Sequence, residues 1–248
     1  MIHMTHRLNR KPRIYDPRNY KLTRPSNYSL PDEVDFYNMC QMPGIRDQGN
    51  EGSCTGFGIT SSWEIQRILA GEPSFEPSPA AEYYWERVIE GDTSQDNGAM
   101  VQDGLKVLLH TGVIPETEFP YLAGQYMVAP QSQAITDAAA NEIKSYSELT
   151  SLDDVLYALA TKSVVIVGFT VYPSFEQVGS DGNVPMPSSS EQSLGGHCTK
   201  LVGFDTHTRR LKMPNQWGTS WANNGICYVP FEYCDFNHLI DEAWVIQV

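Results

Sequence analysis

Apolar residues in the first half of the chain recur at helical spacing. Between residues 55 and 70 they fall on one face of a 3.6-residue repeat, and Gly71 and Pro73 predict where this helix ends. We expect this helix to be central and buried. Further helices are predicted over 79–90, 101–110 and, from a weaker pattern, 134–141. The first half is therefore predicted to be mainly helical.

The second half is richer in β-forming runs. Ser151 with Asp154 three residues later has the pattern of a capping box, which predicts a short helix to Ala160. The run from Val164 to Val171 is typical of a buried strand. Further strands are predicted over 199–204, 209–213, 225–229 and 243–248. A helical half followed by a β-rich half predicts an α+β fold with two lobes and a cleft between them.

The first 43 residues show neither the helical nor the strand-like spacing of apolar residues. They are rich in Pro, Asn, Tyr and Arg, which predicts an extended segment that wraps around the rest of the chain. Three parts follow from these patterns. We predict a basic extended arm over 1–44, a helical lobe over 45–145 and a β-rich lobe over 146–248.

Charge is distributed unevenly between the arm and the body. The net charge of the 248 residues is −13, but residues 1–24 hold seven Lys and Arg against one Asp, a charge of +6. The remaining chain therefore carries −19, which argues against nucleic acid as the main partner. The arm is suited to binding an acidic protein partner or to lying on its own acidic body. A solvated tail without a role is the simpler alternative.

Cysteine usage and apolar content bear on the compartment. Five cysteines without close pairing do not form a disulfide framework, so we expect a reducing compartment such as the cytoplasm or a virion. We expect no secretory signal, and the most apolar stretch, 164–169, is too short to cross a membrane. We also expect no metal and no cofactor.

One cysteine stands where a turn meets the predicted central helix. Gly49 and Gly52 allow a tight turn, and Ser53 is a good capping residue just before Cys54. The free N–H groups at a helix N-terminus stabilise an anion, so they would lower the pKa of this thiol and favour the nucleophilic thiolate. A small buried hydrophobe is the alternative role for such a cysteine.

A nucleophilic thiol needs a base, and His197 has the most suitable context of the histidines. Gly195 and Gly196 precede it, and an apolar strand follows, so the imidazole would stand at a strand start facing the cleft. A structural role is the alternative. Eighteen residues later the run 213–225, Met-Pro-Asn-Gln-Trp-Gly-Thr-Ser-Trp-Ala-Asn-Asn-Gly, is the strongest motif in the chain.

Together these elements resemble the signatures of papain-like cysteine peptidases, in particular their compact microbial and viral branch. Gln48 precedes Cys54, a Gly-His pair stands at 196–197, and Asn215 opens an Asn-x-Trp-Gly-x-x-Trp motif. The His and the Asn follow the Cys by 143 and 161 residues, close to the family's spacing. The resemblance covers residues 30–248. It implies the papain-like two-lobe fold, with a helical left lobe, a β-barrel-like right lobe and the active-site cleft between them.

The resemblance also implies roles. Cys54 would attack the peptide carbonyl as a thiolate, and His197 would be its acid and base. Asn215 would orient the imidazole, while Gln48 and the Cys54 N–H would stabilise the oxyanion. Trp217 would shield the Asn–His hydrogen bond. The pocket for the second residue before the cut would be apolar and would be lined by Gly98, Ala99, Met100, Gly195 and Cys198.

Some positions depart from the family pattern. Glu51 replaces a cysteine that forms a disulfide in many relatives, and its charge would oppose thiolate formation. Thr55 replaces the common tryptophan after the nucleophile. Cys198 puts a second sulfur near the cleft, where packing or a redox role would explain it. Glu51 is thus the residue expected to tune this site away from its relatives.

The sequence predicts a cysteine endopeptidase that hydrolyses protein or peptide substrates through a Cys54 thioester. Two alternatives stay open at this point. One is an inactive papain-like binding or structural module inside a larger assembly. The other is an acyltransferase that passes the same thioester to an amine.

Overall fold

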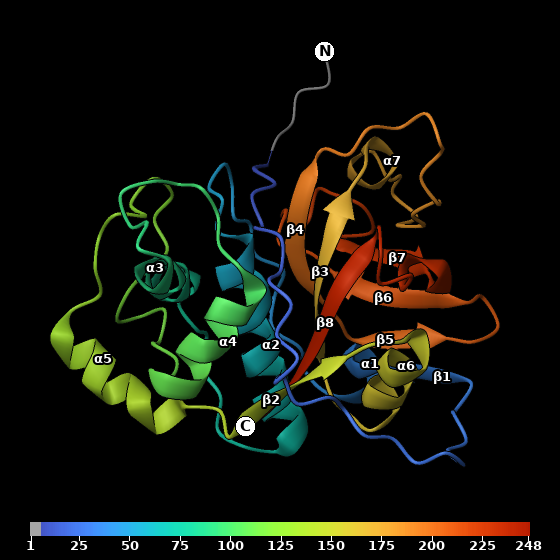
Figure 1. Cartoon of the computed structure of the whole chain (residues 1–248), viewed down its shortest axis with the longest axis horizontal. Coiled ribbons are helices and arrows are strands. Elements are labelled where there is room, and N and C mark those ends of the chain that lie inside the picture. Colours follow the sequence, from blue (N-terminus) through green and yellow to red (C-terminus); the bar gives the residue numbers. More distant parts are fainter. Residues whose placement is uncertain (1–5) are drawn as a thin grey trace.

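The helical lobe is built around one long helix. The computed structural model describes residues 6–248, and Figure 1 shows this lobe on the left and the strands, with the short helices that join them, on the right. The helices of the left lobe are α2 (Cys54–Ala70), α3 (Pro79–Glu90), α4 (Val101–His110), α5 (Ser132–Ala138) and the 3-10 turn η1 (Ala139–Asn141). Helix α2 packs against α3 and α4 on one side and against strand β4 on the other, so it forms the boundary between the lobes.

Local sequence explains the position of α2. The helix ends at Gly71, whose φ of 71° is the left-handed conformation of a helix C-cap. Gly58 allows the close approach to β4, because a Cβ there would lie 2.9 Å from the sulfur of Cys198. The predicted central helix is therefore confirmed, and it carries Cys54 to the edge of the other lobe.

Two four-stranded antiparallel sheets form the right lobe of the described chain. One has the order β2-β8-β3-β4 and the other the order β1-β5-β6-β7. The strands are β1 (Glu33–Asp35), β2 (Ser145–Leu149), β3 (Val165–Val171), β4 (Gly195–Leu201), β5 (Gly203–Asp205), β6 (Arg210–Pro214), β7 (Ile226–Pro230) and β8 (Ile240–Gln247). Short helices join them: α1 (Phe36–Met39), α6 (Leu152–Ala160), α7 (Pro173–Glu176) and the 3-10 turn η2 (Phe231–Tyr233).

Strand β3 is covered on both faces, which explains its continuous apolar run. Val165 and Val167 belong to the core of the right lobe. Ile166, on the opposite face, packs in a second core with Trp63 of α2 and Trp244 of β8. Burying both faces ties the sheet to the helix and fixes the two walls of the cleft.

The predicted α+β fold with two lobes is confirmed. The right lobe consists of open sheets that do not close into a barrel. The run predicted as one strand over 199–204 is divided between β4 and β5, because the chain leaves one sheet for the other at Val202. Strands β1 and β2 carry no sequence pattern that predicted them. The domain boundaries at residues 44 and 145 stay predictions.

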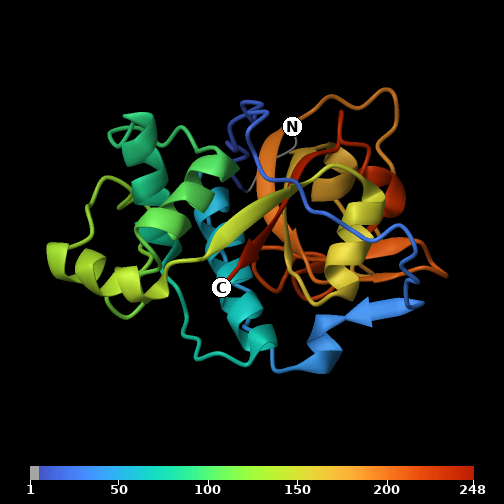
Figure 2. The ribbon, with the colours of Figure 1, turned by 60° about the horizontal axis from the view of Figure 1, so that its bottom comes forward.

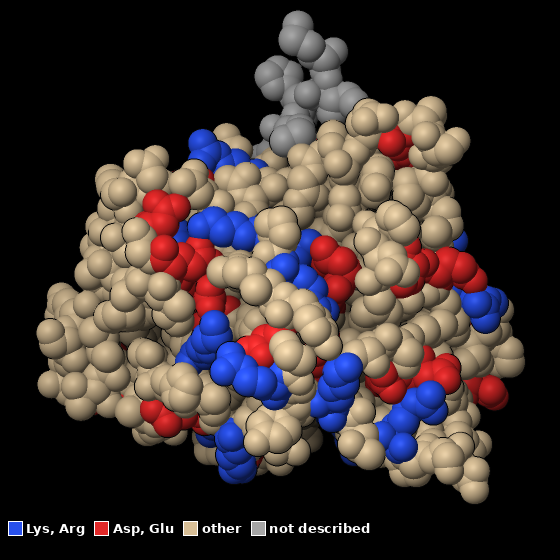
Figure 3. All heavy atoms as spheres, viewed as in Figure 1, with Lys and Arg blue, Asp and Glu red and all other residues tan. Residues whose placement is uncertain are grey.

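The arm lies against the body from residue 6 onward; the part before it falls outside the described residues. Its dark blue trace starts between the lobes in Figures 1 and 2 and then crosses the β-rich lobe to β1. Along this course blue basic and red acidic residues alternate on the surface in Figure 3. The ion pairs include Arg7–Asp96, Arg10–Glu242, Lys11–Glu90, Arg13–Glu148 and Arg24–Asp154. None of the described helices is long and apolar enough to span a membrane.

Candidate active site

His197 and Asn215 meet at the edge of the right lobe. His197 lies near the start of β4, and Asn215 directly follows β6, which packs against β4. The imidazole Nε2 is 2.8 Å from Oδ1 of Asn215. An amide oxygen accepts hydrogen bonds, so this contact places the proton of a neutral ring on Nε2 and leaves Nδ1 as the acceptor. Nδ1 has no partner among the described residues and is free to take a proton.

Aromatic rings enclose the imidazole. The ring of Trp217 lies 4.9 Å from that of His197, and the ring of Phe169 lies 5.5 Å away at a steep angle. Trp217 is itself buried. The His197–Asn215 hydrogen bond thus lies in an apolar, buried environment, where a hydrogen bond is electrostatically stronger than in water.

Cys54 is the first residue of α2, as the sequence predicts. The expected cap is wrong, because the side chain of Ser53 accepts no hydrogen bond from the helix. Its hydroxyl instead lies 3.0 Å from that of Tyr121, which donates to the carbonyl of Gln48 at 2.7 Å. Ser53 and Tyr121 thus fix the loop before the helix.

Gln216 joins the two walls of the cleft and was not singled out from the sequence. Its Nε2 donates to the carbonyl of Cys198 at 2.6 Å and lies 3.4 Å from both the carbonyl of Cys54 and Nε2 of His197. The amide therefore ties helix α2 to the strand that carries the imidazole. The only feature of the sequence that could have identified Gln216 as a site residue is its position directly after Asn215.

Gln48 lies fully buried beside the turn that leads to Cys54. Its Nε2 donates to the carbonyl of Glu51 at 2.9 Å, and its Oε1 has no partner among the described residues. An amide nitrogen carries two N–H groups, so one remains for a ligand. The amide of Gln48 thus keeps a second N–H donor beside the turn that leads to Cys54.

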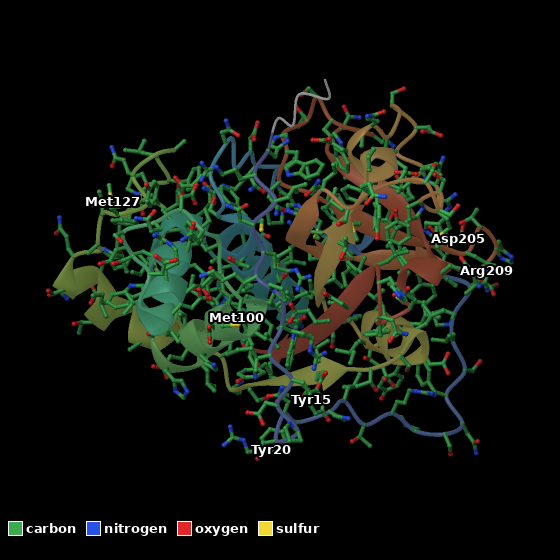
Figure 4. All side chains as sticks on the ribbon, turned by 45° about the horizontal axis from the view of Figure 1, so that its top comes forward. Tyr15, Tyr20, Met100, Met127, Asp205 and Arg209 are labelled. Carbon is green, nitrogen blue, oxygen red and sulfur yellow. The ribbon has the colours of Figure 1, made fainter. Side chains whose placement is uncertain are left out.

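The residues expected to line a substrate pocket lie on both sides of the arm. Gly98 and Ala99 stand on the helical side, and a Cβ at Gly98 would lie 1.8 Å from the carbonyl oxygen of Asn9. Gly195, on the strand side, approaches the carbonyl of Leu8 in the same way. Met100 lies beside the arm on the helical side in Figure 4.

Cys198 is the exception within that set. Its sulfur packs against Gly58 of α2, and its carbonyl accepts from Gln216. All five cysteines are free. The structure thus gives Cys198 a packing role between the lobes.

Residues 6–13, the covering segment, close the cleft over these side chains. The ring of His6 stacks on Trp217 with centroids 4.8 Å apart and planes inclined by 6°. Further along, Asn9 forms a β-bridge with Gly196. In this covered site Cys54, Gln48 and His197 are 0% exposed and Asn215 is 1% exposed.

Burial of the site determines the direction of its pKa shifts. Desolvation raises the pKa of the Cys54 thiol to about 12, and the carboxylate of Glu86 adds to the effect. Desolvation also lowers the pKa of His197 to about 3, against the opposing hydrogen bond to Asn215. The expected low thiol pKa is therefore wrong for the covered site. Both groups are therefore uncharged at neutral pH, because burial disfavours a thiolate and an imidazolium.

Glu86, rather than Glu51, is the acid that acts on the thiol. Glu51 accepts a hydrogen bond from the N–H of Gly124 at 2.9 Å, on the far side of the loop. Glu86 accepts from the hydroxyl of Thr55, the residue after the nucleophile, at 2.5 Å. Glu86 and Glu82 are buried close together, and desolvation raises the pKa of each of these two carboxyl groups. That Glu51 tunes the site stays a prediction. Glu86 was not expected, because the sequence does not show which acid α3 turns toward α2.

Within residues 6–248, no group of three or more His, Cys, Asp or Glu side chains gathers as a metal site would require.

Comparison with known proteins relates this geometry to a family. The family model described as papain family cysteine protease matches residues 30–238. An uncharacterised peptidase C1-like protein of Acanthamoeba polyphaga mimivirus is 32% identical over 213 residues, which cover 81% of this chain and 68% of the relative. Cathepsin B of Dictyostelium discoideum is 26% identical over 234 residues, 85% of this chain and 71% of the relative.

Among solved structures, xylellain, a cysteine protease from Xylella fastidiosa, superposes with a TM-score of 0.90 at 31% identity. That match covers 100% of this chain and 99% of xylellain. The alignment to Peptidase 1 of Euroglyphus maynei spans 62% of that relative's length, so the chain corresponds to part of some relatives only.

Proposed function

Because the chain belongs to the papain family of cysteine proteases, we propose that it is a cysteine endopeptidase that hydrolyses peptide bonds in proteins or peptides. The observation that carries the proposal is the pairing of His197 with Asn215 beside the N-terminus of the helix that begins at Cys54. A scaffold has no need for an imidazole with a free Nδ1 at the end of a helix that begins with a cysteine. The alternatives of an inactive module and an acyltransferase gain no support from any contact.

The reaction follows from the positions of these groups. When water reaches the cleft, Nδ1 of His197 accepts the proton of Cys54, and the thiolate attacks the carbonyl carbon. The imidazolium then protonates the leaving amine, and the neutral ring later activates the water that hydrolyses the thioester. Asn215 holds the ring through Nε2 in both steps.

When the thiolate attacks, negative charge develops on the carbonyl oxygen of the substrate, and hydrogen-bond donors are needed to stabilise it. The free N–H of Gln48 and the backbone N–H of Cys54 supply them, and loss of one such donor costs about 3–4 kcal/mol of transition-state stabilisation in measured enzymes. Trp217 keeps water from the Asn215 contact. The glycines at 98 and 195 leave room for a peptide backbone on both sides of the cleft.

The covering segment keeps this enzyme inactive. It excludes substrate sterically, and it removes the water that would stabilise the ion pair of Cys54 and His197. Its displacement therefore opens the cleft and charges the nucleophile in one step. The basic arm in this way regulates its own acidic body.

Hydrolysis of casein by the full chain carrying Arg10→Ala tests the proposal. This change removes the central anchor of the covering segment, so we expect cleavage well above that of the unmodified chain. Adding Cys54→Ser should abolish cleavage, whereas Cys40→Ser, at a half-buried cysteine outside the site, should preserve it. Equal cleavage with and without Cys54 would refute the proposed nucleophile.

A further inference from the structure

A cavity of about 360 Å³ lies at the boundary between the two lobes. Its walls come from helix α2, strand β4, residues 43–46 and the loop that follows β6. Neither Cys54 nor His197 lines this cavity, and no residue of the covering segment does. Because ligand pockets in proteins begin at about 300 Å³, this cavity has room for a small molecule while the covering segment is in place.

Two side chains of opposite charge line the cavity without a partner. Lys200, on β4, is only 6% exposed, and Glu64, on α2, is half-buried. Within residues 6–248 neither side chain makes a hydrogen bond or an ion pair. Buried charged groups are costly unless they are paired, so this arrangement favours a ligand that supplies the missing partners.

The pKa shifts of both groups agree with unpaired charges. Burial lowers the pKa of Lys200 to about 8, although the carboxylate of Glu64 is near enough to oppose this shift. Burial raises the pKa of Glu64 to about 7, and the charge of Glu76 adds to the effect. The ammonium and the carboxylate therefore influence each other across the cavity but do not neutralise each other.

The other cation of the cavity already has its partners. Nη2 of Arg46 lies 3.0 Å from Oε2 of Glu116, and its Nε lies 3.4 Å from Oε1 of Glu76. The cavity therefore offers one free cation and one free anion. A simple anion that binds Lys200 would face the charge of Glu64, and a simple cation at Glu64 would face Lys200. A ligand that carries both charges satisfies both groups.

Apolar side chains form much of the remaining wall, among them Ile45, Phe57 and Ile65. We propose that this cavity binds a free α-amino acid with an apolar side chain, with its carboxylate on Lys200 and its ammonium on Glu64. The site is separate from the proposed peptidase cleft and does not depend on the proposed function.

The cavity adjoins the amides that hold the imidazole. Asn215 and Gln216 both line it, and each contacts Nε2 of His197 from its side chain. Nδ2 of Asn215 is buried and has no partner among the described residues. A ligand between Glu64 and Lys200 joins α2 to β4 next to these amides. Its binding therefore fixes the two lobes relative to each other.

Thermal unfolding of the full chain with leucine tests the site. The measurement is made near pH 7.5, between the pKa values of the two groups, where both carry charge. At ten times its dissociation constant, leucine should raise the melting temperature by about 3–5 °C. Two compounds that each lack one charge, 4-methylpentanoate and 3-methylbutylamine, should bind at least about tenfold more weakly, because each leaves one buried group unpaired.

Matched variants assign the binding to the two charges. By calorimetric titration, Lys200→Met and Glu64→Gln should each weaken leucine binding by at least about tenfold. Lys144→Met and Glu142→Gln, at exposed positions outside the cavity, should leave it unchanged. Because each of the first two changes removes an unpaired charge, neither should lower the melting temperature without ligand.

Three outcomes would overturn the proposal. The first is the absence of any leucine-dependent shift, which would mean that the cavity holds only water. The second is an equal response to leucine and to the two singly charged compounds. The third is unchanged leucine binding in Lys200→Met and Glu64→Gln. None of these readouts depends on peptide cleavage, so failure of the amino-acid site and failure of the proposed function are distinguishable.

Discussion

The arm consists of the covering segment and, further along, an outer part that includes Ile14, Arg18 and Tyr20. The two parts are similar in composition but differ in their surroundings. In the covering segment, Arg10 is buried and pairs with the fully buried Glu242. Further along, Arg18 pairs with Asp16 of the arm itself, and its side chain is 88% exposed. Tyr20 is 80% exposed and stands away from the body in Figure 4.

Net charge alone does not distinguish the part of the arm that covers the site from the part that lies in solvent. Both parts carry arginines, but ion pairs in water contribute little, because solvent screens them and side-chain entropy opposes them. In the cleft the ion pair of Arg10 and Glu242 is shielded from solvent. Removing Arg10 therefore leaves the carboxylate of Glu242 with neither solvent nor a partner. The covering segment is thus held by burial as well as by charge.

The largest expected effect distinguishes the two arginines. Arg10→Ala leaves Glu242 buried without its cation and should lower the free energy of unfolding by about 3–5 kcal/mol. Arg18→Ala removes an exposed pair and should cause no measurable change. Urea unfolding of both variants measures the free energy of unfolding. Equal losses in the two variants would contradict the claim that burial makes the Arg10 pair stronger than the Arg18 pair.

Acid pH should lower the stability of the covered site, because it protonates the imidazole of His197 beneath the covering segment. Burial lowers the pKa of His197 to about 3, below its ordinary value of 6.5, so the unfolded chain binds this proton first as pH falls. The stability that His197 contributes is complete above pH 6.5 and should be lost toward pH 3, by about 3 kcal/mol at pH 4. Unfolding measured against pH for the chain and for His197→Gln isolates this effect. Parallel curves would contradict the burial of a neutral ring.

Sequence predicted the elements with strong periodicity and the residues that carry reactive atoms. The helix at Cys54 and the strand over Val165–Val171 follow from local pattern. The pairing of His197 with Asn215 was expected from family resemblance, and the structure places them in contact. Their catalytic roles stay proposals.

Sequence did not predict the contacts that depend on tertiary placement. Glu242 is 232 residues from Arg10, and a β-bulge rather than a motif brings their charges together. The expected direction of the Cys54 pKa shift was also wrong, because the helix terminus is a local feature whereas the burial of the thiol depends on tertiary packing. Gln216 and Glu86 lacked any pattern of their own.

The smallest expected effect concerns apolar contacts of the arm. Leu8, in the covering segment, is buried in the core of the right lobe, whereas Ile14 is 68% exposed. Leu8→Ala should lower the free energy of unfolding by about 2 kcal/mol, and Ile14→Ala by less than about 0.5 kcal/mol. Thermal unfolding of both variants checks this. A larger loss for Ile14→Ala would show that the outer part holds the arm in place.

The most direct test of a covered cysteine peptidase site is the rate at which Cys54 reacts with iodoacetamide at pH 7, mapped by mass spectrometry. In the full chain we predict that Cys54 reacts no faster than the buried Cys227, because the thiol is shielded and uncharged. In the chain with Arg10→Ala, Cys54 should become the fastest of the five cysteines. Reaction of Cys54 at the same rate in both proteins would contradict the account.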